Sequence, residues 1–266
     1  QKEIGRQEEI IRRFKQRGTE KLAKRAASRE KRLAAMDLVE RPEAQRGTMK
    51  ISFKADFQSG RDVLLAEGIS KSFGYGSGRV DLFHDVNLDI KRGERICIVG
   101  ANGIGKTTLL NIIMGLVSAD SGMAGYSFQS GAVMTDGGYR TSAVFQETSL
   151  VPHLNPVINV AMVLGHNSDK KRIKQELGYL IDEEFLDKPC AQYSGGMKRR
   201  VEIVRAIMAD SDIVVMDEPF AGLDDTTKNK VIGYIMDNIG DRILIISTHD
   251  LSDAEKLGAK VFFVDA

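Results

Sequence analysis

Hydrophobic and polar positions follow two different patterns along the chain, and the pattern changes near residue 62. Residues 2–16 carry apolar side chains at helical spacing between many charges, and Thr19 is placed to cap a second such segment. The apolar face of this second helix consists of Leu22, Ala26, Leu33 and Met36. The pattern predicts a basic helical hairpin over residues 1–50 and an extended linker over residues 51–61.

Over residues 62–266, short apolar runs alternate with helical segments, which predicts an α/β domain. Runs that are apolar at nearly every position are typical of strands buried on both faces, so we expect a mainly parallel sheet covered by helices. These runs are RICIVG, SAVFQ, DIVVMDE, RILIIST and KVFFVD. The first stretch of the domain alternates more, which favours an antiparallel β-subdomain. Helical patterns dominate residues 147–205, and we expect a helical subdomain there.

Charge is distributed unevenly between these two parts. The 266 residues have a formal net charge of +1, but residues 1–50 hold 15 Lys or Arg against 8 Asp or Glu, a net of +7. The remainder therefore holds 23 basic and 29 acidic residues, a net of −6. A basic segment joined to a mildly acidic domain favours an anionic partner for that segment, although a solvated amphipathic hairpin without any ligand has the same pattern.

The composition argues against several classes of protein. The sequence contains no run of about eighteen apolar residues, so it predicts no membrane-spanning helix. No charged-then-apolar leader opens the chain, which favours a cytoplasmic protein; the chain begins at Gln1, and whether it is a fragment is left open. Cys97 and Cys190 are the only cysteines, and no CxxC pair occurs, which argues against a disulfide framework and a zinc site. Cys97 is expected to be a buried small apolar residue.

A phosphate-binding loop is predicted at residues 100–108, GANGIGKTT, between the apolar strand ERICIV and the helical TLLNIIMG. Its glycines allow successive backbone N–H groups to turn toward phosphate oxygens, and the start of the helix adds a favourable dipole. Lys106 is placed to reach the β- and γ-phosphates, Thr107 to bind Mg²⁺ and Thr108 to bond a phosphate. The other candidate nucleotide-binding residues of the loop are Gly100, Asn102, Gly103 and Gly105.

Two acidic residues, Asp217 and Glu218, end the apolar run IVVM. Asp217 is expected to hold Mg²⁺ through its water shell, and Glu218, which points elsewhere, to polarise the attacking water. Adjacent acids at a strand end otherwise form a solvated turn. The phosphate-binding loop upstream favours the catalytic interpretation.

Two further polar residues follow predicted strands and are expected at the same edge of the sheet. His249, in STHD after ILIIS, is a candidate contact to the γ-phosphate and to the attacking water. Gln146, after SAVF, is a candidate contact to Mg²⁺ or to the water. A lone histidine or glutamine is more often structural, so both assignments depend on the position after a strand.

Six features in this order resemble the ATP-binding cassette (ABC) ATPases: GANGIGKTT, Gln146, YSGGMKRR, IVVMDEP, AGLD and STHD. The resemblance covers residues 62–266 and implies an ABC nucleotide-binding domain with the fold of the phosphate-loop NTPases. It implies Mg²⁺-dependent ATP hydrolysis between two cassettes, as a homodimer or heterodimer, packed head to tail around two ATP molecules. The catalytic residues would be Glu218, His249 and Gln146, and the metal-binding residues Thr107, Gln146 and Asp217.

The resemblance also gives roles to residues far from the phosphate-binding loop. Ser194, Gly195 and Gly196 at a helix start would bind the γ-phosphate of the ATP held by the opposite cassette. Asp224, in AGLD, would lie across the same interface and couple the two sites. Phe73 would stack on the adenine, with Tyr75 as a second candidate.

Two parts of the chain resemble different branches of this family. Residues 1–122 are similar to the linker and the start of the second cassette in ABC-F proteins, which are ribosome-associated ATPases. Residues 123–266 are similar to nitrate- and sulfonate-type transporter subunits, although Tyr193 and Met197 replace the usual Leu and the usual Gln or Glu beside SGG. Three alternatives remain: a transporter motor, an ABC-F translation or antibiotic-resistance factor, and a chimera. The residues closest to the catalytic motifs favour the transporter type.

These alternatives differ in their partners. A transporter motor would bind a membrane permease through the helical subdomain, at the inner face of the membrane. An ABC-F-like factor would bind ribosomal or transfer RNA through residues 1–40, whose basic side chains would neutralise phosphates. In every case we expect ATP and Mg²⁺ as cofactors and a second cassette as partner.

Overall fold

The computed structural model describes Ala27 and five further segments of the chain, which are residues 63–74, 79–127, 133–134, 139–165 and 168–264. All five segments fall in the second of two compact units, Asp56–Ala266. Apart from the helical Ala27, the predicted hairpin over residues 1–50 lies outside the described residues, as do the linker over residues 51–61 and Tyr75. The predicted domain boundaries therefore stay predictions.

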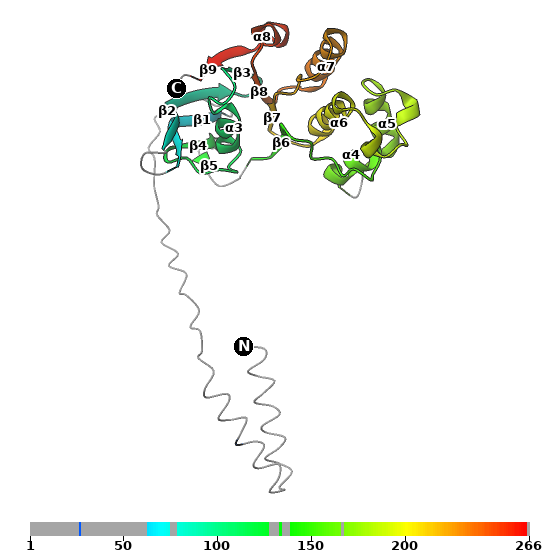
Figure 1. Cartoon of the computed structure of the whole chain (residues 1–266), viewed down its shortest axis with the longest axis horizontal. Coiled ribbons are helices and arrows are strands. Elements are labelled where there is room, and N and C mark those ends of the chain that lie inside the picture. Colours follow the sequence, from blue (N-terminus) through cyan, green and yellow to red (C-terminus); the bar gives the residue numbers. More distant parts are fainter. Residues whose placement is uncertain are drawn as a thin grey trace. The chain divides into compact units, whose positions relative to one another are not determined.

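A five-stranded parallel sheet has the strand order β6–β7–β8–β3–β9 (Figure 1). Every pairing within it is parallel. Four strands fall within the predicted apolar runs and β6 begins one residue before SAVFQ, at Thr141, so the predicted parallel sheet is confirmed. The strands are β3 (Arg95–Val99), β6 (Thr141–Val144), β7 (Ile213–Asp217), β8 (Ile243–Thr248) and β9 (Lys260–Phe263).

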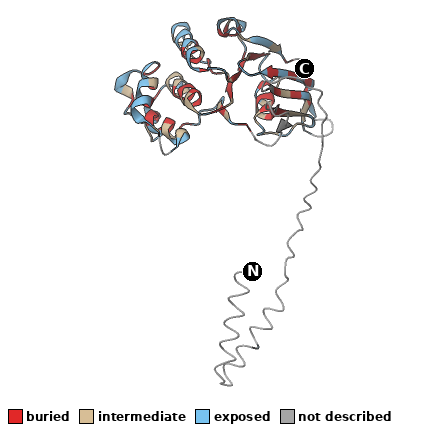
Figure 2. Cartoon of the chain, turned by 180° about the vertical axis from the view of Figure 1, so that it is seen from behind, coloured by how far each residue is buried: buried red, intermediate tan, exposed pale blue. Residues whose placement is uncertain are grey.

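The central strands are buried on both faces, because successive side chains of a strand point to opposite sides of the sheet. On β7, Val214 and Met216 join one hydrophobic core, whereas Ile213 and Val215 join a second core that includes the antiparallel strands. Figure 2 shows these central strands as buried. Burial on both faces explains why the strand sequences are apolar without alternation.

A second sheet is antiparallel, with the strand order β2–β1–β4–β5. It consists of β1 (Val63–Phe73), β2 (Val80–Lys91), β4 (Ser121–Ser127) and β5 (Val133–Met134). The predicted antiparallel β-subdomain is confirmed for the first two strands, but the other two were not anticipated, because β4 carries two glycines and little alternation. Gly122 has a φ of 79°, and a Cβ there would lie 2.3 Å from the Gly68 carbonyl carbon. Only glycine permits this close approach of β1 and β4.

Helices lie between several pairs of successive strands in the chain order. α3 (Lys106–Ile113) follows β3 directly, and α7 (Asp225–Asn238) and α8 (Leu251–Leu257) follow β7 and β8. The described residues between 147 and 205 contain no strand, which agrees with the helical pattern of that stretch. The elements there are α4 (Pro156–Leu164), α5 (Lys170–Gly178), the 3₁₀ helices η2 (Glu183–Phe185) and η3 (Cys190–Gln192), and α6 (Gly195–Met208).

The structure bears on two predictions from composition, one about the cysteines and one about membrane-spanning helices. Cys97 on β3 and Cys190 on η3 are both free and buried, so the prediction that Cys97 is a buried apolar residue is confirmed. Burial raises the pKa of the Cys97 thiol to about 12 and that of the Cys190 thiol to about 11. None of the described helices is long and apolar enough to cross a bilayer.

Candidate functional site

The loop at residues 100–108 turns from β3 into α3, and two of its glycines have conformations that other residues rarely adopt. Gly103 and Gly105 have φ angles of 85° and 102°. At Gly105 a Cβ would also lie 3.0 Å from the ring of Phe83. The loop therefore requires glycine at both positions, and it places Lys106 in the first turn of α3.

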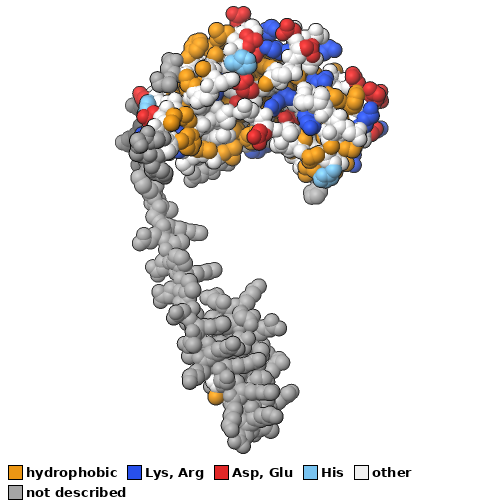
Figure 3. All heavy atoms as spheres, viewed as in Figure 1, with side chains coloured by type: hydrophobic (Ala, Val, Ile, Leu, Met, Phe, Trp, Pro, Cys, Tyr) orange, Lys and Arg blue, Asp and Glu red, His pale blue; other side chains and the backbone are white. Residues whose placement is uncertain are grey.

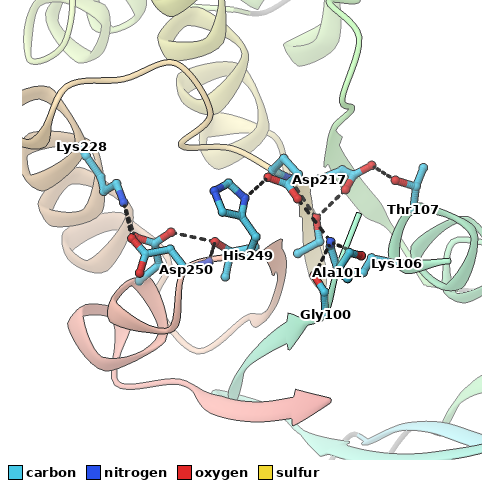
Figure 4. A network of polar contacts seen from close by, with 12 residues as sticks. Gly100, Ala101, Lys106, Thr107, Asp217, Lys228, His249 and Asp250 are labelled. Carbon is cyan, nitrogen blue, oxygen red and sulfur yellow. Dashed lines mark hydrogen bonds and ion pairs between the residues drawn. The ribbon is translucent and has the colours of Figure 1, made fainter. Parts of the chain in front are cut away.

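Lys106 is almost fully buried, with only 6% of the residue exposed. Its Nζ donates hydrogen bonds to the backbone oxygens of Gly100 at 2.8 Å and Ala101 at 3.1 Å (Figure 4). The same Nζ lies 3.5 Å from Oε1 of Glu218. These partners offset the cost of burying the ammonium group. The result is a fixed cation beside a glycine-rich loop, an arrangement suited to phosphate oxygens.

Thr107 and Asp217 bring together oxygen atoms from the start of α3 and the end of β7. The Thr107 hydroxyl donates to Oδ2 of Asp217 at 2.6 Å, and the buried Ser247 hydroxyl donates to Oδ1 at 2.5 Å. Hydroxyl and carboxylate oxygens are the ligand types that Mg²⁺ prefers, and Mg²⁺ sites in nucleotide enzymes use few protein ligands. The two side chains therefore fit the predicted metal site.

Glu218 follows β7 with a φ of 48°, which is unusual for a residue with a side chain. Its backbone N–H donates to Oγ of Ser247 at 2.9 Å, which anchors the turn to β8. Its Oε2 lies 3.0 Å from Nδ1 of His249. The Glu218 carboxylate therefore lies between the ammonium group of Lys106 and the imidazole of His249.

Most of the predicted site residues line one cleft of about 450 Å³. Phe73, at the end of β1, is 50% exposed and lines this cleft, so its ring is available for stacking. Gln146, which follows β6, lines it as well. Leu82 was not predicted, because an apolar residue in a strand carries no distinguishing signal. The complete lining is Phe73, Leu82, Asn102, Gly103, Gly105, Lys106, Thr107, Thr108, Gln146 and Glu218.

The SGG segment and Asp224 do not line this cleft. Ser194 caps α6, where its Oγ accepts from the N–H of Met197 at 3.2 Å. Asp224 caps α7 and is exposed. A Cβ on Gly196 would lie 3.1 Å from Cδ2 of Leu223, so the start of α6 and the AGLD loop are neighbours. Ala221, Gly222 and Leu223 of that loop line a second hollow, which Glu218 and His249 also line.

The residues that hold the strand ends in place were not predicted from the sequence. Ser247 is fully buried and bonds both Asp217 and the backbone of Glu218. Its signal was a hydroxyl, next to that of Thr248, at the end of an apolar run. Lys228 on α7 donates to Asp250 at 3.0 Å and to the buried Asp253 at 2.7 Å. The hydrogen bond from Lys228 is the main cause that lowers the pKa of Asp250 to about 2.

Comparison with protein families gives two matches in this chain. A model described as ABC transporter matches residues 83–221, and a second model with the same description matches residues 1–53. The first match includes the phosphate-binding loop, the SGG segment and the acidic pair at the end of β7.

Two curated relatives match over more than two thirds of their length. The bicarbonate transport ATP-binding protein CmpD of Synechocystis is 32% identical over 200 residues, covering 72% of this chain and 70% of the relative. The taurine import ATP-binding protein TauB of Pseudomonas aeruginosa is 31% identical over 210 residues, covering 76% of this chain and 78% of the relative.

Solved structures agree with the fold. The ATP-binding cassette MJ0796, in a dimeric post-hydrolysis state bound to ADP and Pi, has a TM-score of 0.65 and 25% identity, covering 76% of this chain and 94% of that chain. The predicted phosphate-loop NTPase fold of the cassette type is confirmed. None of these findings supports the ABC-F interpretation, a chimera or an RNA partner.

Proposed function

Because this chain belongs to the ABC transporter family, we propose that it is the ATP-hydrolysing motor of an import-type membrane transporter. ATP binding and hydrolysis are the activity of cassettes of this family, and the chain carries the corresponding site. Beyond that activity, we propose roles for individual residues, a second cassette as partner and a membrane permease as partner.

The phosphate groups of ATP would lie between the loop N–H groups and Lys106. A Mg²⁺ ion bound to Thr107, Asp217 and Gln146 would neutralise charge on the phosphate oxygens. The loop amides and the Lys106 ammonium provide fixed charge at the same place, so little reorganisation is needed during the reaction. Support comes from the 2.6 Å contact between Thr107 and Asp217, and from the position of Gln146 in the same cleft.

Glu218 would accept a hydrogen bond from the attacking water and orient it toward the γ-phosphate. His249 would hold both the Glu218 carboxylate and the γ-phosphate, since its Nδ1 already lies 3.0 Å from Glu218. Residues held at a positive φ are frequently functional, and the conformation of Glu218 supports its role. Phe73 would stack on the adenine at the mouth of the cleft.

Ser194, Gly195, Gly196 and Asp224 would act on the ATP of a second cassette. They lie at the exposed starts of α6 and α7 and do not line the cleft of their own chain. A helix N-terminus attracts anions, because its N–H groups and dipole point outward. A similar cassette has been solved as a dimer, which supports a second copy as the partner.

The permease would bind at α4, at the inner face of the membrane. Ile158, Met162 and Val163 are exposed there by 37%, 60% and 53%. Figure 3 shows an apolar patch over this part of the surface. Three exposed apolar side chains on one short helix are typical of a binding surface.

The single observation that carries the proposal is the convergence of Lys106, Thr107 and Glu218 on one cleft while the SGG segment stays outside it. Cells that contain the transporter would be fractionated, and the amount of this chain in washed membranes measured. Met162→Asp should remove it from the membranes without changing ATP hydrolysis by the purified chain. Leu116→Asp is the matched control, because Leu116 is equally exposed, at 60%, and lies away from α4. Equal membrane binding of all three proteins would contradict a permease contact at α4.

A further inference from the structure

A buried carboxylate on α6 lies outside the nucleotide cleft and contacts the loop that carries Gln146. Glu202 is only 1% exposed, and a buried carboxylate is costly unless it is paired and hydrogen-bonded. Its Oε1 accepts from the backbone N–H of Ser149 at 2.6 Å and from the Thr148 hydroxyl at 3.1 Å. These bonds fix the chain two and three residues after Gln146.

The part of the loop before residue 147 is held by Arg199. Its guanidinium donates to the backbone oxygen of Phe145, and to that of Gln146 at 2.6 Å. One of its nitrogens also lies 3.4 Å from Oε2 of Glu202. Arg199 and Glu202 therefore form one ion pair whose two ends contact the loop before and after residue 147.

Helical spacing explains why α6 makes these contacts with one face. Arg199, Glu202 and Arg205 lie at intervals of three residues, so their side chains point the same way. Arg205 extends the contact by donating to the hydroxyl of Ser149 at 2.5 Å and to its backbone oxygen at 3.3 Å. In the sequence, Glu202 was recognisable only as an acidic residue within the otherwise apolar run VEIV.

We propose that Glu202 and Arg199 are positioning residues for Gln146, and that they tie its position in the cleft to the orientation of α6. This inference rests on the proposed function, in which Gln146 contacts Mg²⁺. The loop has no regular secondary structure of its own, and bonds from α6 hold it on both sides of Gln146. Since Ser194 caps α6, the helix that would contact the ATP of a second cassette also positions the metal contact of Gln146 in its own cassette.

Glu202→Gln is the informative substitution because it preserves size while removing the charge. The side-chain oxygen of the glutamine still accepts a hydrogen bond from the Ser149 N–H. Its uncharged amide nitrogen faces the Arg199 guanidinium, so the ion pair is lost. Glu176→Gln is the matched control. Glu176 accepts a 3.0 Å hydrogen bond from Tyr234 and does not contact the loop. Arg199→Lys is a second variant, since one ammonium group does not reproduce the planar fork that bonds two carbonyl oxygens.

The full chain would be studied by hydrogen exchange and by titration with Mg²⁺ and ATP. In Glu202→Gln and Arg199→Lys, the amides of residues 145–149 should exchange at least about tenfold faster than in the wild type, because local opening becomes easier. The Mg²⁺ concentration for half-maximal hydrolysis should rise about fivefold, while ATP affinity without Mg²⁺ stays within about twofold. Glu176→Gln should change neither quantity.

A double-mutant cycle with Gln146→Ala separates the positioning role of Glu202 from the Mg²⁺-binding role of Gln146. If Glu202 acts through Gln146, Glu202→Gln should have little further effect on the Mg²⁺ dependence once Gln146 is replaced. Additive effects, or unchanged exchange at residues 145–149, would overturn the inference and leave the role of Gln146 intact. A normal Mg²⁺ dependence in Gln146→Ala alone would instead refute that role and the inference with it.

Discussion

The Glu218 carboxylate lies 3.0 Å from Nδ1 of His249, joining residues that follow β7 and β8. The same carboxylate lies 3.5 Å from Nζ of Lys106. Neighbouring parallel strands bring these three groups together at one edge of the sheet. The arrangement fixes the orientation of the Glu218 carboxylate, which is what a residue that polarises water requires.

Replacing Glu218 by Gln should separate ATP binding from hydrolysis. The hydrolysis rate should fall about a hundredfold or more, because the variant loses its general base. ATP binding should persist, and the ATP-bound dimer should accumulate at saturating Mg-ATP. Size-exclusion chromatography with light scattering measures the dimer, and the exposed Glu183→Gln is the control. A Glu218→Gln protein that stays monomeric would refute the two-cassette model.

Lys106→Ala should weaken ATP binding itself. Hydrogen bonds to charged groups contribute about 1.5–3 kcal/mol, so the affinity should fall at least about tenfold. Isothermal titration calorimetry measures the change. Lys170→Ala, an exposed residue on α5, should bind ATP like the wild type. An unchanged dissociation constant in Lys106→Ala would rule out the phosphate-binding assignment.

Ser247→Ala should affect both stability and hydrolysis. The substitution removes a donor to Asp217 and the acceptor for the Glu218 N–H in a fully buried position. Leaving such groups unpaired should lower the free energy of unfolding by about 1–3 kcal/mol. The hydrolysis rate should fall about tenfold, since the carboxylates lose their support. Urea unfolding and steady-state assays measure the two effects. Ser252→Ala, which leaves Asp217 and Glu218 untouched, should retain the hydrolysis rate.

The ion pair between Asp250 and Lys228 should make the free energy of unfolding depend on pH in the acidic range. The folded-state pKa of Asp250 is lowered to about 2, below the unfolded value of about 3.9. A lowered pKa stabilises the fold above the unfolded pKa, and this contribution is lost as the pH falls from about 4 toward 2. The stability difference between the wild type and Asp250→Asn should therefore be largest near pH 7 and shrink below pH 4. Urea unfolding at several pH values tests this, and a difference that grows in acid would contradict the assignment.

The sequence alone determined the parallel sheet, the phosphate-binding loop and the residues at the strand ends. Each rests on a local property: apolar runs such as that of β7, glycines at the positive φ of Gly103 and Gly105, and polar residues directly after a strand. Local patterns of this kind depend on near neighbours in the chain, so they can be recognised without coordinates.

Only the tertiary structure showed which distant groups meet. Thr107 and Asp217 are 110 positions apart, and Gln146 and Arg199 are separated by 53. Strand order and helix packing decide these contacts, and no periodicity in the sequence encodes them. Ser247 and Glu202 therefore remained hidden within apolar runs until the fold placed hydrogen-bonding partners beside them.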